Sequence, residues 1–179
     1  MRTAAVFLDR DGTIMEDANY VGQLERVTLI PGAAAALQQL QTAGYRLFII
    51  TNQSGVGRGY FTREAVEQIH AHLDEQFGRS GVKFAGYYVC PHHPADNCEC
   101  RKPRPKLLLD AAAREGVDLA GSYMIGDRAS DIQAGVNAGT RTVLVLTGVG
   151  RETQVAGQVQ PDFVATDLAA AAAWILNQP

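Results

Sequence analysis

Two pairs of aspartates have the spacing that suits a divalent cation. Asp9 and Asp11 follow a short apolar run, and in extended backbone residues two apart face the same side, about 6–7 Å apart at Cα. Asp127 and Asp131 follow a second apolar run, at the start of a segment typical of a helix. Neighbouring carboxylates repel one another, so a bound cation is the natural way to hold them together. The sequence therefore predicts a cation site formed by carboxylates.

Residues that suit an anionic ligand follow two further apolar runs. The segment Thr51-Asn52-Gln53-Ser54 offers hydroxyl and amide groups to phosphate oxygens, and Arg101 and Lys102 add positive charge. Each feature also has an ordinary structural explanation. An aspartate can cap a helix, Thr51 can form a turn, and Lys102 can be a solvated surface charge. Their joint occurrence beside successive predicted strands favours a phosphate site.

One short segment contains every cysteine of the chain and two histidines: Cys90, His92, His93, Cys98 and Cys100. An odd number of clustered cysteines is unlike the disulfide framework of a secreted protein. Three thiolates and one imidazole form the closed ligand set of a structural zinc ion. Because Arg101 and Lys102 come next, zinc would order the loop that carries them. A nucleic-acid zinc finger is the alternative, but this segment differs from one in spacing and in charge.

Five apolar runs rich in β-branched and aromatic residues are predicted to be strands. They are Ala4–Asp9, Arg46–Thr51, Phe84–Val89, Ser122–Gly126 and Arg141–Leu146. Most are apolar throughout, as expected of parallel strands that are covered on both faces.

Helical patterns occur between these strands, and each ends at a glycine, which tolerates the left-handed closing conformation. They are Ala33–Ala43, Thr62–Phe77, Pro105–Glu115 and Asp131–Ala138, and an Ala-rich helix is predicted at Leu168–Leu176. Thr62 is a candidate N-cap. The alternation of strands and helices predicts a doubly wound, mostly parallel α/β sheet, whose ligands bind at the carboxyl ends of the strands.

Composition excludes several classes of function. Sixteen basic residues against nineteen acidic residues give a formal net charge of −3, which argues against nucleic acid or an anionic membrane as a partner. No apolar run approaches the ~20 residues that a membrane helix needs. The apolar run at Ala4–Leu8 is too short for a signal peptide. We expect a cytoplasmic protein.

The four polar segments occur in the order of the four motifs of the haloacid dehalogenase superfamily of phosphatases, which the chain resembles. The matching residues are Asp9-x-Asp11-Gly12-Thr13, Thr51, Lys102 and Gly126-Asp127-x-x-x-Asp131. The resemblance implies that Asp9 is the nucleophile and becomes phosphorylated. It also implies Mg²⁺, held by the side chains of Asp9 and Asp127 and by the backbone carbonyl of Asp11.

The same resemblance assigns the remaining catalytic roles. It implies that the Asp11 side chain protonates the leaving oxygen and later activates water. It implies that Thr51 and Lys102 contact the transferring phosphoryl group, and that Asp131 orients the site without binding the metal directly. The segments between Thr13 and Lys102 are too short for a cap domain, so we expect an open, capless active site.

Within the superfamily, the loops resemble those of the heptose-bisphosphate phosphatases, which remove the C7 phosphate of D-glycero-D-manno-heptose 1,7-bisphosphate during synthesis of nucleotide-activated heptose. This resemblance implies that His92 rather than His93 is the zinc ligand, and that Arg101 recognises the part of the substrate that does not react. The implied substrate-binding residues are Asp17, Ala18, Asn19, Tyr20, Thr51, Asn52, Gln53, Ser54, Arg101, Lys102 and Arg128.

Two alternatives remain open. The short zinc loop, with Ala95-Asp96-Asn97, and the segment Ser122–Gln133 resemble the histidinol-phosphatase domain of histidine biosynthesis, whereas Arg58-Gly59 and Asn19-Tyr20-Val21 favour the heptose enzymes. A phospho-accepting receiver domain is the distant alternative; its adjacent acids differ from the Asp9-x-Asp11 spacing. We expect residues 1–179 to form a single, monomeric domain with a zinc-binding loop at 90–102 and a small phosphorylated sugar as its substrate.

Overall fold

The computed structural model describes residues 3–178. Its centre is a parallel sheet in the order β3-β2-β1-β4-β5-β6. The strands are β1 (Ala5–Leu8), β2 (Arg46–Asn52), β3 (Phe84–Cys90), β4 (Tyr123–Gly126), β5 (Arg141–Val145) and β6 (Phe163–Ala165). The α-helices are α1 (Ala33–Thr42), α2 (Ser54–Gly57), α3 (Arg63–Gly78), α4 (Lys106–Glu115), α5 (Ala129–Ala138), α6 (Gly150–Ala156) and α7 (Leu168–Leu176). Short 3₁₀ helices are η1 (Leu24–Arg26) and η2 (Pro94–Asp96). The predicted doubly wound α/β fold is confirmed.

The order of the strands places a crevice at the ends of β1 and β4. The chain passes from β1 outward to β2 and β3, and then returns to place β4 on the other side of β1. Leu8 pairs with Ile49 of β2 and with Ile125 of β4, so the residues after these strands emerge at one edge of the sheet. Such a reversal is where open α/β sheets bind ligands.

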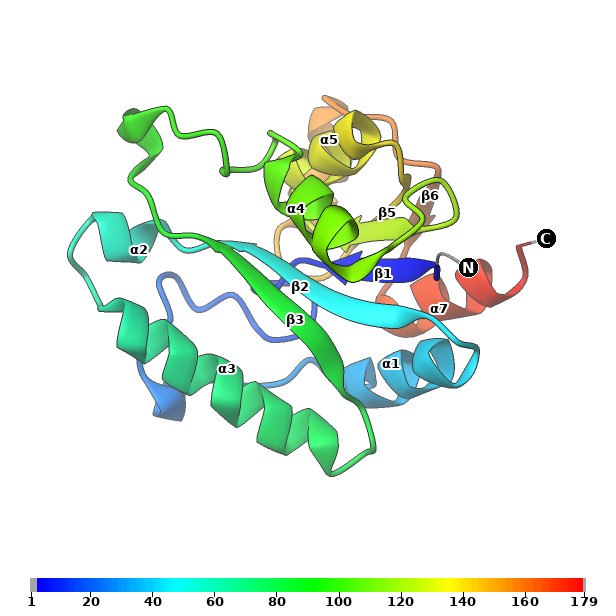
Figure 1. Cartoon of the computed structure of the whole chain (residues 1–179), viewed down its shortest axis with the longest axis horizontal. Coiled ribbons are helices and arrows are strands. Elements are labelled where there is room, and N and C mark those ends of the chain that lie inside the picture. The colour runs from blue at the N-terminus through cyan, green and yellow to red at the C-terminus, as the bar shows by residue number, and fades with distance from the viewer. Residues whose placement is uncertain (1–2, 179) are drawn as a thin grey trace.

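Helices cover both faces of the sheet. Figure 1 shows α1, α3 and α7 on one side and α4 and α5 on the other. Successive strand residues point to opposite faces, so Val6 and Leu8 belong to the core beneath α1, α3 and α7, whereas Phe7 belongs to the core beneath α4 and α5. Burial on both faces explains why the strands are apolar throughout.

Several helix ends follow the predicted signals. The Thr62 side chain accepts a hydrogen bond from the backbone of Ala65 at 3.2 Å, and Asp167 caps α7 in the same way through Ala170 at 2.8 Å. Glycine closes α4 and α5 in the left-handed conformation. α3 ends at Gly78 as predicted, but the expected left-handed closure at this glycine is wrong: Arg79 is the C-cap, and the left-handed residue is Gly81, with φ of 75°.

One strand, two α-helices and the two 3₁₀ helices were not predicted from the sequence. β6 is an edge strand of three residues, too short for a recognisable pattern. α2 is a single turn rich in glycine, and α6 buries only Gly150, so it lacks an apolar stripe. Across residues 3–178, no helix is both long enough and apolar enough to cross a membrane.

Candidate active site

A buried acidic cluster with one lysine lies at the crevice. Carboxylate oxygens of Asp9, Asp127 and Asp131 lie within 4.8 Å of one another, and all three residues are buried. Asp9 follows β1, where its backbone N–H donates to Ile125 of β4 at 2.9 Å. Lys102 Nζ lies 2.6 Å from Asp9 Oδ1 and 2.7 Å from Asp131 Oδ1. One ammonium group therefore balances only part of the negative charge of the cluster.

Burial sets the protonation of this cluster. It raises the pKa of Asp9 well above its usual range, and Lys102 opposes that rise. Burial and the charge of Asp131 raise the pKa of Asp127 to about 7. A further cation at the cluster would favour the ionised form of both carboxyl groups.

Asp127 has one oxygen held by the protein and one available. Val149 donates its backbone N–H to Oδ2 at 2.9 Å. A Cβ added at Gly12 or Gly148 would lie 2.3 or 2.2 Å from this oxygen, so only glycine fits at either position. The other oxygen, Oδ1, is buried and has no hydrogen-bond partner within residues 3–178. A buried, unpartnered carboxylate oxygen beside two further carboxylates fits a divalent cation that prefers oxygen ligands.

Asp11 lies apart from this acidic cluster. β1 ends at Leu8, and the chain then turns, with Ile14 donating its backbone N–H to the carbonyl of Arg10 at 3.1 Å. The extended backbone expected from Asp9 to Asp11 is therefore wrong. The Asp11 carboxylate instead accepts hydrogen bonds from the Arg10 guanidinium at 3.0 Å and from Gln53 Nε2 at 2.8 Å. Its side chain remains 20% exposed, at the edge of the crevice.

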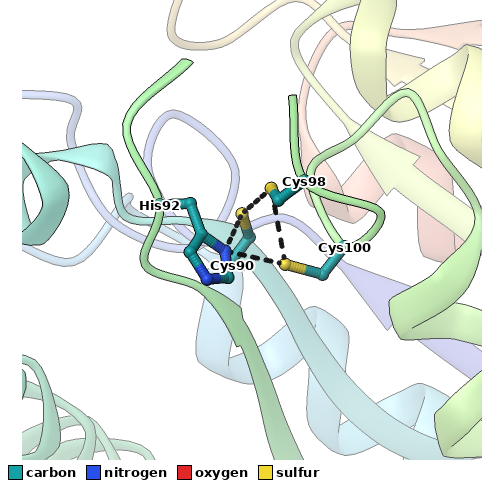
Figure 2. Close-up of side chains that lie close together, drawn as sticks. All are labelled: Cys90, His92, Cys98 and Cys100. Atoms are coloured by element: carbon teal, nitrogen blue, oxygen red, sulfur yellow. Dashed lines mark hydrogen bonds between the residues drawn. The ribbon is translucent and has the colours of Figure 1, made fainter. Parts of the chain in front are cut away.

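The cysteine segment folds into a four-residue cluster at the end of β3 (Figure 2). His92 Nδ1 lies 3.2 Å from the Cys100 sulfur and 3.7 Å from the Cys90 sulfur. The Cys98 sulfur lies 3.5 Å from that of Cys90 and 3.7 Å from that of Cys100. Zn–S bonds of about 2.3 Å in a tetrahedral site place sulfurs about 3.8 Å apart. The donor set and its spacing fit zinc.

The neighbouring histidine has a different role. His93 Nδ1 accepts a hydrogen bond from the backbone of Ala95 at 3.1 Å and so caps η2. Burial raises the pKa of the Cys90 thiol to about 12, so a thiolate there needs a cation to stabilise it.

The cysteine segment is attached directly to the acidic site. Asn52 Oδ1 accepts a hydrogen bond from the backbone of Lys102 at 3.1 Å, and Asn52 Nδ2 donates to the carbonyl of Lys102 at 3.3 Å. Arg104 donates to the carbonyls of Asn97 and Cys98. A Cβ at Gly57 would lie 2.3 Å from the backbone nitrogen of His93, so α2 packs closely on this loop. The conformation of the cysteine segment thus determines where Lys102 lies.

A pocket of about 360 Å³ opens above Asp9. It is lined by Asp9, Asp11, Asp17, Asn19, Tyr20, Val21, Asn52, Gln53, Ser54, Arg101, Lys102, Arg128, Ser130 and Asp131. Arg101 Nη1 is buried and has no hydrogen-bond partner in the described part of the chain. An acidic floor with basic side chains on its wall suits a phosphate ester bound together with a metal ion.

Comparison with known proteins decides the family. A family model described as haloacid dehalogenase-like hydrolase matches residues 6–96, and a second hydrolase model of the same class matches residues 99–171. The chain belongs to the haloacid dehalogenase-like hydrolases.

The relatives of this hydrolase are phosphatases. It is 39% identical to D-glycero-beta-D-manno-heptose-1,7-bisphosphate 7-phosphatase of Yersinia pestis, over 92% of this chain and 91% of the relative. It is 45% identical to the Helicobacter pylori enzyme of the same name, over 80% and 83%. Its structure resembles D,D-heptose 1.7-bisphosphate phosphatase from B. bronchiseptica, complexed with magnesium and phosphate, with a TM-score of 0.93, 36% identity and coverage of 98% and 99%.

Most of the predicted catalytic, magnesium-binding and substrate-binding residues of this hydrolase line the pocket, and three of them do not. Ala18 contacts the hydrophobic core, and its carbonyl accepts a hydrogen bond from Arg26. Thr51 is buried, with its hydroxyl accepting from Gln53 Nε2 at 2.8 Å. Asp127 lies beneath the pocket floor. Val21 and Ser130 line the pocket but were not among the predicted site residues. Ser130 could have been found from its place between Asp127 and Asp131, in the first turn of α5.

The segment at 17–20 forms one wall of the hydrolase pocket in an unusual backbone conformation. Asn19 and Tyr20 have φ of 50° and 55°, which is rare for a bulky residue such as tyrosine. Arg128 holds the segment through Asp17 at 2.6 Å. Tyr20 contacts Tyr60 edge to face, with ring centroids 5.0 Å apart. These contacts fix an exposed aromatic ring beside a polar pocket, where it can contact a sugar.

Proposed function

We propose that this hydrolase removes the C7 phosphate of D-glycero-D-manno-heptose 1,7-bisphosphate in the synthesis of nucleotide-activated heptose, using Mg²⁺. The observation that carries the proposal is the contact of Lys102 with Asp9 on the floor of a pocket whose wall contains Arg101 and Arg128. The pocket combines a buried nucleophile with separate cations for a second phosphate. The names of the relatives support heptose bisphosphate as the substrate.

Asp9 and Asp127 would hold Mg²⁺ through their side chains, and Asp11 through its backbone carbonyl. The unpartnered oxygen of Asp127 supports this assignment. When bound, Mg²⁺ reduces the repulsion between an anionic carboxylate and a phosphate monoester. The solved relative that is complexed with magnesium and phosphate supports the choice of metal.

Two aspartates would carry out the chemistry. Asp9 attacks phosphorus, so a bond forms between its carboxylate oxygen and phosphorus while the bond from phosphorus to O7 of the sugar breaks. Asp11 gives a proton to O7 as it leaves. Asp11 then takes a proton from the water that attacks the aspartyl phosphate. This second step releases phosphate and restores the Asp9 carboxylate.

Lys102 and Thr51 would stabilise the charge that develops on the transferring phosphoryl group. Lys102 is buried, so its ammonium group acts with little screening by water. Asp131 lies 2.7 Å from Lys102 and would therefore orient its ammonium group. Thr51 is fixed by Gln53, which also contacts Asp11.

Residues in the wall of the pocket would bind the part of the sugar bisphosphate that does not react. Arg101 has an unpartnered Nη1, and Arg128 is partly exposed beside Asp17, so both can meet an anion. The segment Asp17–Tyr20 and the residues Asn52, Gln53 and Ser54 complete the proposed substrate contacts.

The cluster of Cys90, His92, Cys98 and Cys100 would hold a structural zinc ion, with residues 90–102 acting as one zinc-binding loop of a single domain over residues 1–179. Four protein ligands leave no open position for a substrate. The distances among the four donor atoms support zinc. Thiolate ligands suit a reducing compartment, which supports the expected cytoplasmic location.

Steady-state kinetics with Mg²⁺ tests the substrate. D-glycero-D-manno-heptose 1,7-bisphosphate is expected to give a much larger kcat/KM than histidinol phosphate, which lacks the second phosphate. Asp9→Asn protein, purified identically, controls for contaminating phosphatases. A larger kcat/KM for histidinol phosphate would overturn the proposed substrate and leave the proposed chemistry intact.

A further inference from the structure

Arg10 is a charged side chain that is fully buried beside the active site. Its exposed fraction is 0%, and it is the largest of the fully buried side chains in residues 3–178. Its backbone carbonyl accepts hydrogen bonds from Ile14 at 3.1 Å and from Met15 at 3.3 Å, so the turn holds its Cα in place. Burial of a guanidinium group is costly unless it is paired. The function proposed above gives Arg10 no role.

The partner of Arg10 is the carboxylate of Asp11. Arg10 Nε donates to Oδ2 at 3.0 Å, and Arg10 Nη2 donates to Oδ1 at 3.0 Å. These two parallel bonds form the bidentate fork that a planar guanidinium can make and a lysine cannot. The two hydrogen bonds together fix the plane of the Asp11 carboxylate as well as its position.

Gln53 makes the two oxygens of Asp11 different. Its Nε2 donates to Oδ2 at 2.8 Å, so Oδ2 accepts two hydrogen bonds. A carboxylate oxygen has about two lone-pair sites, and those of Oδ2 are both used. Oδ1 accepts a single bond within the described residues, the one from Arg10 Nη2. The lone pair that is left for a proton is therefore on Oδ1.

We propose that Arg10 is a positioning residue for Asp11: together with Gln53 it occupies Oδ2 and so makes Oδ1 the oxygen that exchanges the catalytic proton. The inference rests on the acid–base role of Asp11 in the proposed function. In the first step the O–H bond at Oδ1 breaks and its proton goes to the departing O7, which leaves as an alcohol. In the second step Oδ1 takes one proton from the attacking water, which restores the protonated carboxyl group.

The surroundings of Arg10 direct it towards Asp11 alone. Asp11 is its ion-pair partner, and Arg10 Nη1 has no hydrogen-bond partner in the described part of the chain. His70 of α3 is buried on the same side of the sheet, and burial together with the positive charge of Arg10 lowers the pKa of His70 to about 3. A neutral imidazole adds no charge that would compete for the Asp11 carboxylate.

The dependence of rate on the leaving group tests this role. An alkyl phosphate such as the heptose bisphosphate needs a proton on its leaving oxygen, whereas p-nitrophenyl phosphate releases a stable phenolate without one. For Arg10→Met we expect kcat/KM for the alkyl ester to fall by ~100-fold, the size expected of a misplaced catalytic group. For p-nitrophenyl phosphate, kcat/KM should fall by about tenfold at most. Arg10→Lys keeps the charge and loses the fork, and should behave like Arg10→Met.

Arg46→Met is the matched control, because Arg46 is another ion-paired arginine, 2.6 Å from Glu115 and remote from the pocket. Arg46→Met should change kcat/KM for the two esters by the same factor. Equal losses for the two esters in both Arg10 variants, or full rescue by Arg10→Lys, would overturn the positioning role. Wild-type protein that hydrolyses neither ester would instead overturn the proposed function.

A crystal structure of the wild-type protein with Mg²⁺ and vanadate gives a test that needs no variant. The oxygen of Asp11 that receives only Arg10 Nη2 should be the one nearest the apical vanadate oxygen that stands for the leaving group. The oxygen shared by Arg10 Nε and Gln53 should keep both donors. If the shared oxygen faces vanadate instead, the assignment of proton exchange to Oδ1 is wrong, whatever the variants show.

Discussion

Lys102 Nζ donates a hydrogen bond to Asp9 Oδ1 at 2.6 Å, although the two residues lie far apart in the sequence and on different elements. Both side chains are buried, and the same ammonium group also contacts Asp131 at 2.7 Å. Two carboxylates thus share one lysine, and burial raises the pKa of Asp9 despite this contact. The arrangement places the proposed nucleophile, Asp9, beside a buried cation.

Replacement of Lys102 by methionine should therefore affect both rate and stability. We expect kcat to fall by about 10²–10³-fold, as for loss of one charge-stabilising donor. The free energy of unfolding should fall by about 3–5 kcal/mol, because two buried carboxylates lose their partner. Kinetics and urea unfolding measure the two effects. Lys106→Met is the control, since Lys106 is half-exposed on α4 and should change neither quantity appreciably. An active Lys102→Met enzyme would contradict the assigned role.

Asp9→Asn should abolish turnover while the protein stays folded. An amide is not a nucleophile for phosphorus, and loss of one negative charge from a crowded acidic cluster does not strain the fold. Acid-quenched wild-type enzyme should retain phosphate on Asp9, detected by mass spectrometry, and the variant should retain none. Asp110→Asn, a change at a half-exposed aspartate of α4, should keep full activity. Phosphate found on another residue would mean that Asp9 is not the nucleophile.

The pKa of Asp127 predicts that Mg²⁺ binding depends on pH. Because that pKa is about 7 and the metal needs the ionised carboxylate, a proton competes with Mg²⁺ below pH 7. The apparent Kd should rise by up to about tenfold for each pH unit below 7, as measured by calorimetry. Asp127→Asn should bind Mg²⁺ weakly at every pH. A Kd that is constant between pH 5.5 and 8 would contradict this prediction.

The same group makes the stability of the metal-free protein depend on pH in the opposite direction. An unfolded Asp127 loses its proton near its ordinary pKa of 3.8, while the folded protein keeps it up to about pH 7. The free energy of unfolding without added Mg²⁺ should therefore fall as the pH rises from about 4 to 7, and then level off. Urea unfolding at a series of pH values tests this, and in Asp127→Asn the dependence should be weaker.

The sequence predicted that the candidate catalytic residues lie close together, because their positions are determined by the ends of the strands. Asp9 and Asp127 directly follow parallel strands and Thr51 lies among the last residues of β2, and the carboxyl ends of such strands share one edge. The cysteine cluster was predictable for a similar reason, since its residue types and close spacing leave few other roles. The helix at Leu168–Leu176 was predicted from its Ala-rich apolar run.

The environment of Arg10 could not be predicted from the sequence. A charged residue between two aspartates suggests exposure to solvent, yet Arg10 is fully buried and its guanidinium is paired with the Asp11 carboxylate. Such features arise from packing between distant segments, which local patterns do not record.

Removal of one sulfur from the cysteine cluster should lower stability and activity together. Cys98→Ser should bind less zinc, measured by mass spectrometry of the metal content, and should unfold at a lower temperature. Because Asn52 and the loop hold Lys102 in place, kcat should fall as well, although no cysteine lines the pocket among the described residues. His93→Ala is the matched control: His93 caps η2 through Ala95 and does not face the sulfurs, so its zinc content should be normal. If His93→Ala loses as much zinc as Cys98→Ser, the fourth ligand is His93 and the assignment to His92 is wrong. Normal zinc content in Cys98→Ser would exclude this cluster as the zinc site.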